Sequence, residues 1–239
     1  MNFFFSIGVG GSKSKVGKTT FIESMIRNIK KIFGDNTKIV AIKYTKTSVF
    51  SSIVSDTSII ETSGKDTERM KKAGADFIYW VKASEDELSD VAEKLKKEIL
   101  FRKFNPYREF FCPLSKKYIH KVIVIIEGNS LVRIMHPDVI IFLKDNETKY
   151  IKPSGEALLK IADIVIEGQY CMEEVMDEIL KIEQKKLIER LLIERSNSGK
   201  ITCAEARKIA EELNVPYIEV GRTANELKIK IRKCELGCF

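Results

Sequence analysis

The feature that most constrains this chain is the segment from Gly10 to Thr20, which reads Gly-Gly-Ser-Lys-Ser-Lys-Val-Gly-Lys-Thr-Thr. It follows an apolar run, Phe3 to Val9, and precedes an amphipathic run, Phe21 to Phe33. A strand, a glycine-containing turn and a helix in this order form the context that a phosphate-binding loop requires. In such a loop the backbone N–H groups point inward, and the helix directs the positive end of its dipole at the same anion. The segment therefore predicts a binding site for a nucleoside triphosphate.

Individual side chains of this segment have predicted roles. Lys18 is expected to reach the β- and γ-phosphates as a catalytic group, and Thr19 is expected to hold Mg²⁺. The residues predicted to contact the nucleotide are Gly11, Ser12, Lys13, Ser14, Lys15, Val16, Gly17, Lys18, Thr19 and Thr20.

The match to the standard loop has one departure, because Ser12 stands where the pattern has a glycine five residues before Gly17. The neighbouring Gly10 and Gly11 could supply the tight turn instead. A variant loop, Lys-Gly-Gly-x-Gly-Lys-Thr, fits the spacing from Lys13 onward, and its early lysine can reach a nucleotide across a dimer. Ser14 and Lys15 replace the two middle glycines of that variant. Both interpretations stay open, and a basic surface turn without a ligand is the third.

The composition narrows the class of protein. A chain of 239 residues can hold one full α/β domain and something small. No apolar run approaches the roughly 20 residues that cross a bilayer. Five widely spaced cysteines, an odd number, argue against a disulfide framework and favour the cytoplasm. The net charge of +7 lies in residues 1–118, which hold 22 of the 41 Lys and Arg but 14 of the 34 Asp and Glu. Phosphate-rich small molecules account for that excess as well as nucleic acid does.

Apolar strands alternate with amphipathic helices over the first 168 residues, which predicts an α/β fold with a mostly parallel sheet flanked by helices. The expected strands are Phe3–Val9, Lys38–Lys43, Asp76–Val81, Val122–Ile126, Val139–Leu143 and Ile164–Ile166. The expected helices are 20–33, 67–73, 84–104 and 153–160. The polar stretch 44–65 is interpreted as a functional loop, and 105–120 as a surface insertion.

The last forty residues have a different character. We predict a nucleotide-binding domain over 1–170, a connecting helix and linker over 171–198, and a small helix-turn-helix-like domain over 199–239, with a winged form as one alternative. Its helices are expected at 202–213 and 217–227, with a short strand at 228–232. The second helix carries Arg222 and Asn225 but also Glu219 and Glu226, so it is net negative. Because duplex binding depends on neutralised phosphates, a protein-docking or dimer module is favoured over DNA binding.

Two further carboxylates are candidate metal ligands with catalytic roles. Glu127 follows the run Val122–Ile126, where strand ends of an α/β sheet meet a ligand, and it could hold Mg²⁺ through water. A solvated strand-end carboxylate is the alternative. Asp66 is interpreted either as a second metal or water-positioning group or as a helix N-cap. Residues 128–130 are expected to form a flexible polar turn beside the phosphates.

Weaker candidates concern the base and a second metal. Lys144 and Asp145 follow a late strand and are predicted to contact a guanine base, although the usual Asn-Lys-x-Asp spacing is absent. Cys234 and Cys238, with Cys203 as a possible third ligand, could bind a metal, but core cysteines are the favoured interpretation.

Several segments resemble the molybdopterin-guanine dinucleotide biosynthesis adapter (MobB) family. They are Gly17–Glu23, Val40–Lys43, the run Gly64–Asp76 and Ile126-Glu127-Gly128, and the resemblance spans residues 3–168. It implies a P-loop NTPase fold and a dimeric protein that binds GTP and Mg²⁺, with at most slow GTPase activity. Its implied role is to assist a guanylyltransferase that attaches GMP to molybdopterin.

Carried over by position, the resemblance makes Gly17, Lys18 and Thr19 nucleotide-binding and places Glu127 and Asp66 near Mg²⁺. The chain departs from the family after Lys43, where Tyr44-Thr45-Lys46-Thr47 replaces the usual histidines. The loop from Lys13 is also altered. Two other functions stay open: a dimeric ATPase of the Lys13 type in metal delivery or partitioning, and a nucleotide-responsive DNA-binding regulator.

Overall fold

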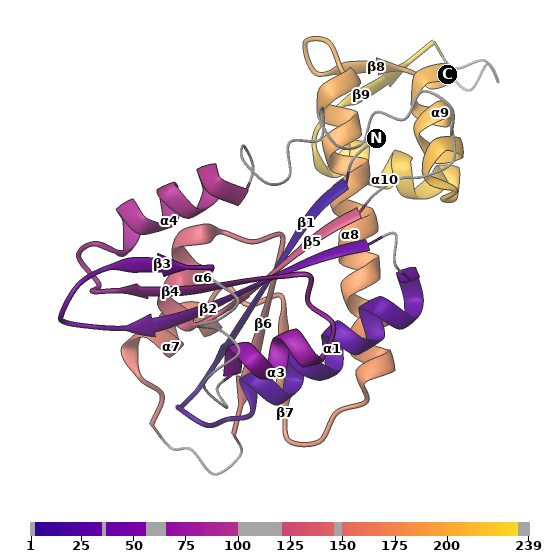
Figure 1. Cartoon of the computed structure of the whole chain (residues 1–239). Helices are drawn as coiled ribbons and strands as arrows, with labels where there is room; N and C mark the ends of the chain where they lie inside the picture. The colour runs from indigo at the N-terminus through magenta and orange to yellow at the C-terminus, as the bar shows by residue number, and fades with distance from the viewer. Residues whose placement is uncertain (1–2, 35–36, 56–65, 100–120, 146–149, 234–239) are drawn as a thin grey trace, which may run out of the picture. The chain divides into compact units, whose positions relative to one another are not determined.

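The computed structural model describes residues 3–34, 37–55, 66–99, 121–145 and 150–233 (Figure 1). The chain divides into two compact units, residues 1–176 and 177–239. Each unit has a hydrophobic core of its own. Within the described residues no helix combines the length and the apolar character needed to span a membrane.

Unit 1 is built on a seven-stranded sheet in the order β3-β4-β2-β5-β1-β6-β7. All neighbouring strands run parallel except β3, which pairs antiparallel with β4 at one edge. The strands are β1 (Phe3–Gly11), β2 (Thr37–Lys46), β3 (Ser52–Val54), β4 (Phe77–Ala83), β5 (Lys121–Glu127), β6 (Val139–Lys144) and β7 (Ile164–Glu167). The predicted α/β class with a mostly parallel sheet is thereby confirmed.

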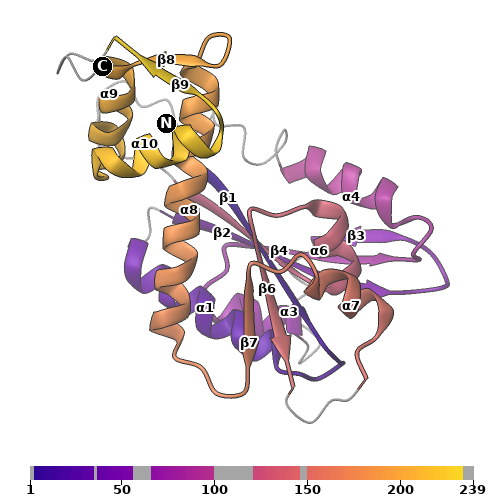
Figure 2. The same cartoon turned by 180° about the vertical axis from the view of Figure 1, so that it is seen from behind.

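Helices cover both faces of this sheet, as Figures 1 and 2 show from opposite sides. On one face lie α1 (Lys18–Phe33) and α3 (Asp66–Lys72), and on the other lie α4 (Leu88–Lys97), α6 (Asn129–Met135) and α7 (Pro153–Leu159). Because both faces are covered, the central strands carry near-continuous apolar runs and do not alternate between apolar and polar residues. The run Val122–Ile126 of β5 is buried at every position.

The strand order brings three chain segments together at the carboxyl end of the sheet. β1 lies between β5 and β6, and β2 lies on the other side of β5. In this register Glu127 pairs with Val9 on β1 and with Lys43 on β2. The carboxyl ends of β1, β2 and β5 therefore meet, which is where an α/β sheet positions its ligand.

The structure differs from the sequence prediction at several places in unit 1, including the helix predicted over 84–104, which begins at Leu88. β2 continues to Lys46, and β3 forms inside the stretch 44–65 that was predicted as a loop. Residues 128–130 do not form a turn of their own: Gly128 has a φ of 125°, and α6 begins at Asn129. Asp66 is the first residue of α3 and ion-pairs with Lys43. These differences arise because packing against the sheet orders segments whose own composition favours turns.

Unit 2 consists of the greater part of α8 (Met172–Arg195), then β8 (Lys200–Thr202), α9 (Cys203–Leu213), α10 (Tyr217–Glu226) and β9 (Lys230–Arg232). Thr202 caps α9 by accepting a hydrogen bond from the Glu205 N–H at 3.2 Å, and Asn214 ends that helix in a left-handed conformation. Ile188, Leu191 and Leu192 of α8 belong to the core of this unit. The unit boundary thus falls inside α8, after Met176, while the predicted domains separated this helix as a connector.

Close packing at the end of β1 generates the first prediction. A Cβ atom on Gly10 would lie 2.1 Å from Leu158 Cδ2 and 2.7 Å from Asn129 Oδ1. We expect Gly10→Ala to destabilise unit 1 by about 1–3 kcal/mol, since overpacking forces neighbours out of their rotamers. Urea unfolding followed by the fluorescence of Trp80, the single tryptophan, measures this.

The matched control is Gly221→Ala in α10, where a Cβ atom meets nothing within 4 Å. That change should not lower the urea midpoint reported by Trp80. An unchanged midpoint for Gly10→Ala would contradict the packing argument.

Candidate functional site

The turn between β1 and α1 is anchored to the neighbouring strand β6. The Ser12 N–H donates to the Leu143 carbonyl at 2.9 Å, and the Ser12 hydroxyl accepts from the Asp145 N–H at 3.2 Å. The Lys13 ammonium pairs with the Asp145 carboxylate. Two residues of the turn, Lys15 and Gly17, have positive φ angles of 65° and 96°. These contacts fix the turn in one conformation.

Asn129, the first residue of α6, fastens the start of the same turn. Its Oδ1 accepts from the Gly11 N–H at 2.9 Å, and its Nδ2 donates to the Gly11 carbonyl at 3.0 Å. The sequence analysis placed residues 128–130 beside the phosphates but did not predict this contact of Asn129, because an asparagine after a glycine is usually a turn signal. Its proximity to the loop depends on β5 lying beside β1.

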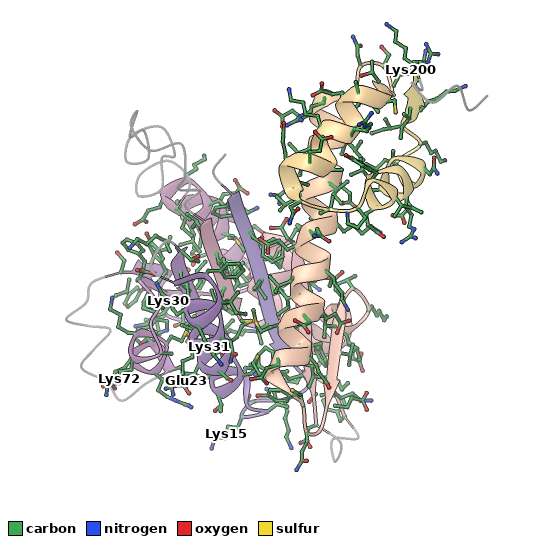
Figure 3. All side chains as sticks on the ribbon, turned by 90° about the vertical axis from the view of Figure 1, so that its right-hand side faces the viewer. Lys15, Glu23, Lys30, Lys31, Lys72 and Lys200 are labelled. Atoms are coloured by element: carbon green, nitrogen blue, oxygen red, sulfur yellow. The ribbon has the colours of Figure 1, made fainter. Side chains whose placement is uncertain are left out.

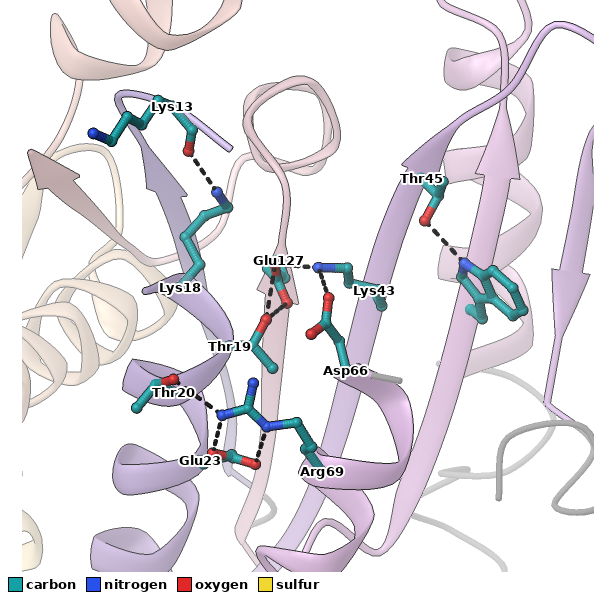
Figure 4. Close-up of polar contacts among 11 residues, drawn as sticks. Lys13, Lys18, Thr19, Thr20, Glu23, Lys43, Thr45, Asp66, Arg69 and Glu127 are labelled. Atoms are coloured by element: carbon teal, nitrogen blue, oxygen red, sulfur yellow. Dashed lines mark hydrogen bonds and ion pairs between the residues drawn. The ribbon is translucent and has the colours of Figure 1, made fainter. Parts of the chain in front are cut away.

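Lys18 and the start of α1 point into the space enclosed by the turn. The Lys18 ammonium donates to the Lys13 carbonyl at 3.2 Å (Figure 4). Burial lowers the pKa of Lys18, and the nearby charge of Glu127 opposes that shift. Within the described residues no side chain caps the N-terminus of α1, where Gly17 precedes the first turn. A desolvated ammonium and uncapped N–H groups at one place create a demand for an anion.

Four side chains from four elements meet beside Lys18 (Figure 4). The Lys43 ammonium of β2 lies between two carboxylates, pairing with Glu127 of β5 and with Asp66 of α3, the latter at 2.8 Å. The Thr19 hydroxyl lies 3.3 Å from Glu127 Oε2. Glu127 is almost fully buried, with 1% of its surface exposed. Burial would raise the pKa of Asp66, but the hydrogen bond and charge of Lys43 hold it below its ordinary value.

The donors of this cluster fit Mg²⁺. One hydroxyl and two carboxylates are hard oxygen donors, and Mg²⁺ commonly takes one or two carboxylates while phosphates and water complete its shell. Within the described part of the chain, no group of three or more His, Cys, Asp or Glu side chains could hold a metal by itself. Thr19, Glu127 and Asp66 would therefore serve such an ion only together with oxygens of a ligand.

Arg69 of α3 is a second site residue that sequence reasoning missed. Its guanidinium donates to both carboxylate oxygens of Glu23, at 2.9 and 2.8 Å, and to the Thr20 hydroxyl at 3.0 Å. The Glu23 charge and hydrogen bond raise the pKa of Arg69. The bidentate pair ties α3 to α1 and holds a cation beside the first turn of α1.

Two cavities flank Lys18. One has a volume of about 480 Å³ and the other about 600 Å³, and both are lined by Ser14, Lys18, Tyr44 and Lys46. The smaller adds the first half of the loop and residues of α6 and α7; the larger adds Thr19, Thr20, Lys43, Asp66, Arg69 and Glu127. Among the predicted nucleotide contacts, Gly11 to Thr20 line one cavity or the other except Val16.

The remaining candidates lie elsewhere. Lys144 pairs with Glu167 at 2.6 Å, Asp145 pairs with Lys13, and neither lines the two cavities. The structure thus brings Asp145 to the loop itself, as a support for Lys13. Cys203 opens α9 in unit 2, and Cys234 and Cys238 lie outside the described residues.

Comparison with known proteins gives no family assignment. No protein-family model matches the chain, and no curated protein matches it.

The buried charge cluster generates a prediction about stability. Lys43→Met removes the cation beside Glu127 and should cost about 3–5 kcal/mol, because an uncompensated charge is left buried. Adding Glu127→Gln should recover part of that loss. If the loss came from a packing defect alone, Glu127→Gln would not recover any stability. Urea unfolding of both variants, monitored through Trp80, provides the measurement.

The control for this prediction is Lys46→Met. Lys46 pairs with Glu85 at 3.1 Å, and both side chains are largely exposed, at 63% and 59%. Its loss should cost about 0–1 kcal/mol. Equal losses for the Lys43 and Lys46 variants would refute the role given to burial.

Proposed function

We propose that unit 1 is a P-loop NTPase domain that binds a nucleoside triphosphate with Mg²⁺ through Gly11–Thr20. The observation that carries this proposal is the convergence of Lys18, the uncapped start of α1 and the Thr19–Glu127 pair on one cavity. Backbone N–H groups and a lysine favour the phosphates, and the oxygen donors favour the metal. Bound Mg²⁺ would neutralise phosphate charge.

We propose GTP as the nucleotide, and an accessory role in attaching GMP to molybdopterin, on the strength of the resemblance to the MobB family. The segments that carry the resemblance supply the site: Gly17–Glu23 forms the start of α1, and Lys43, Asp66 and Glu127 form one ion-paired cluster. A homodimer and a molybdopterin guanylyltransferase partner belong to the same proposal. Lys18, Asp66 and Glu127 are its candidate catalytic groups, and slow hydrolysis is expected.

The dimeric ATPase of the Lys13 type is the less favoured alternative. In that class the early lysine must reach a nucleotide held by the partner. Here the Lys13 ammonium pairs with Asp145 of its own chain. The preference of the protein for guanine or for adenine nucleotides separates the two proposals.

For unit 2 we retain the helix-turn-helix-like interpretation as a proposal. Its support is the succession of α9, a three-residue connection at 214–216 and α10, with β8 and β9 beside them. Ala206, Ile209, Val220 and Ala224 pack these two helices into one core.

Nucleotide binding is tested with Lys18→Ala. The variant should bind a fluorescent GTP analogue at least about 100-fold more weakly, because the ammonium that neutralises the phosphates is lost. Fluorescence titration measures this, and competition with unlabelled GTP and ATP gives the base selectivity. Thr19→Ala should weaken binding only when Mg²⁺ is present.

The matched control is Lys31→Ala, an exposed lysine in the last turn of α1. It should leave the affinity unchanged. Full affinity in a folded Lys18→Ala variant would exclude this loop as the phosphate site, and preference for ATP would exclude the GTP-dependent role.

A further inference from the structure

Unit 2 carries five exposed cations on and beside its two-stranded sheet. Lys200 lies on β8, Lys230 and Arg232 lie on β9, and Lys228 and Lys233 flank β9. All five side chains are exposed. Figure 3 shows Lys200 extending outward from unit 2. Within the described part of the chain, none of the five forms an ion pair or side-chain hydrogen bond, so their charge is uncompensated there.

The register of the sheet concentrates this charge on one face. β8 and β9 pair in parallel, with Lys200 beside Lys230 and Thr202 beside Arg232. Side chains alternate along a strand, so Lys230 and Arg232 share the face that Lys200 occupies. The intervening Ile201 is buried in the core of the unit.

Like charges on neighbouring strands destabilise a sheet, and an acidic or neutral residue at either position would relieve the repulsion. The chain instead keeps Lys200 opposite Lys230 and adds Arg232 on the same face. An anionic partner would turn this unfavourable arrangement into a favourable one. The electrostatic repulsion in the free protein is therefore an indication that this face binds an anionic partner.

Four glutamates of α9 and α10 are paired away from this sheet. Glu205 and Glu212 both accept from Arg195, at 3.4 and 2.5 Å. Glu226 pairs with Lys185 at 2.7 Å, and Glu219 pairs with Arg222 at 3.0 Å. These pairs compensate the four glutamates with Arg195 and Lys185 of α8 and with Arg222 of α10, and they leave the five cations on and beside β8 and β9 without an ion pair among the described residues.

We propose that the face formed by Lys200, Lys230 and Arg232, with Lys228 and Lys233 beside it, binds the phosphate backbone of a nucleic acid duplex. Alternate residues of a strand lie about 6.6 Å apart, so Lys230 and Arg232 present successive cations along one line. A duplex offers a continuous array of phosphates to such a row, and cations that neutralise them release counterions.

The chemistry of this face favours a nucleic acid over the other polyanions. Surfaces that bind membranes combine cations with large apolar side chains on the adjoining face, and Ile231, the only apolar residue of β9, is just 36% exposed and points opposite to Lys230. The negative charge of α10, which argued against DNA at the level of sequence, does not extend to β9. Because α10 is neutralised, contacts to phosphate should dominate, with little sequence preference.

The test is fluorescence anisotropy of labelled 20-base-pair duplexes, one of DNA and one of RNA, with the full chain between 50 and 200 mM salt. We expect binding that weakens steeply with salt. The double variant Lys230→Gln/Arg232→Gln should lower the magnitude of the slope of log K against log salt by about 1.8, since each lost phosphate contact removes about 0.9. The DNA and RNA arms identify which duplex the face prefers.

Lys208→Gln is the matched control, because Lys208 is exposed on α9 of the same unit, where its charge helps to lower the pKa of Glu212. It should retain the wild-type slope. Lys200→Gln provides a second variant on the other strand, with an expected decrease of about 0.9, and circular dichroism verifies that each variant is folded. The Lys18→Ala protein should bind duplex like the wild type, so this inference stands or falls separately from nucleotide binding.

Three outcomes would overturn the proposal. The first is absence of binding to both duplexes at 50 mM salt. The second is an unchanged slope in the folded double variant. The third is equal or tighter binding, lost in the same double variant, to a poly-glutamate peptide or to vesicles containing phosphatidylserine, which would assign the face to an acidic protein or a membrane.

Discussion

The buried carboxylate of Glu127 is the constraint on which the arrangement of unit 1 depends. A carboxylate withdrawn from water is costly unless a cation and hydrogen bonds compensate it. The compensation comes from Lys43, which lies directly opposite Glu127 on β2, and from Thr19 in the first turn of α1. Both are available only because β5 lies between β1 and β2 and all three strands run parallel. The buried charge of Glu127 therefore requires this strand order, because a sheet with another order would leave that charge unpaired.

Around that cluster, the conformation of the loop depends more on hydrogen bonds to its backbone than on its own glycines. Asn129 holds Gly11 through a donor and an acceptor, and Ser12 connects the loop to β6. Ser12 stands where the usual pattern has a glycine, and its hydroxyl accepts from the Asp145 N–H. The departure from the motif thus has a structural use. The Lys13 ammonium pairs with the carboxylate of the same Asp145.

Much of this was predictable from sequence, and the remainder follows from strand order. The strands, the first helix and the place of Glu127 follow from unbroken β-branched runs and from local turn chemistry, which sequence displays directly. The contacts of Lys43, Asn129 and Arg69 do not, because a lysine at a strand end, an asparagine after glycine and an arginine on a short helix each look solvated. The pairing of β2 with β5 and of β5 with β1 brings Lys43 and Asn129 to the loop, and the contact of α3 with α1 brings Arg69 there. The uncompensated charge on β8 and β9 could not be seen in the sequence either, because it depends on which cations form ion pairs with the glutamates of α9 and α10.

Lysine and arginine therefore serve two electrostatic purposes in this chain. In unit 1, Lys43 and Arg69 are held in fixed geometry by Glu127, Asp66 and Glu23, and Lys18 is partly desolvated. Lys43 and Lys18 have lost much of their hydration, and the ion pairs restrict the rotamers of Lys43 and Arg69. These cations therefore favour a small ligand of defined shape, and the buried ones respond weakly to salt. In unit 2, Lys200, Lys230 and Arg232 remain hydrated and unpaired among the described residues. Cations of that kind suit an extended polyanion, and their contribution should disappear as salt replaces the released counterions.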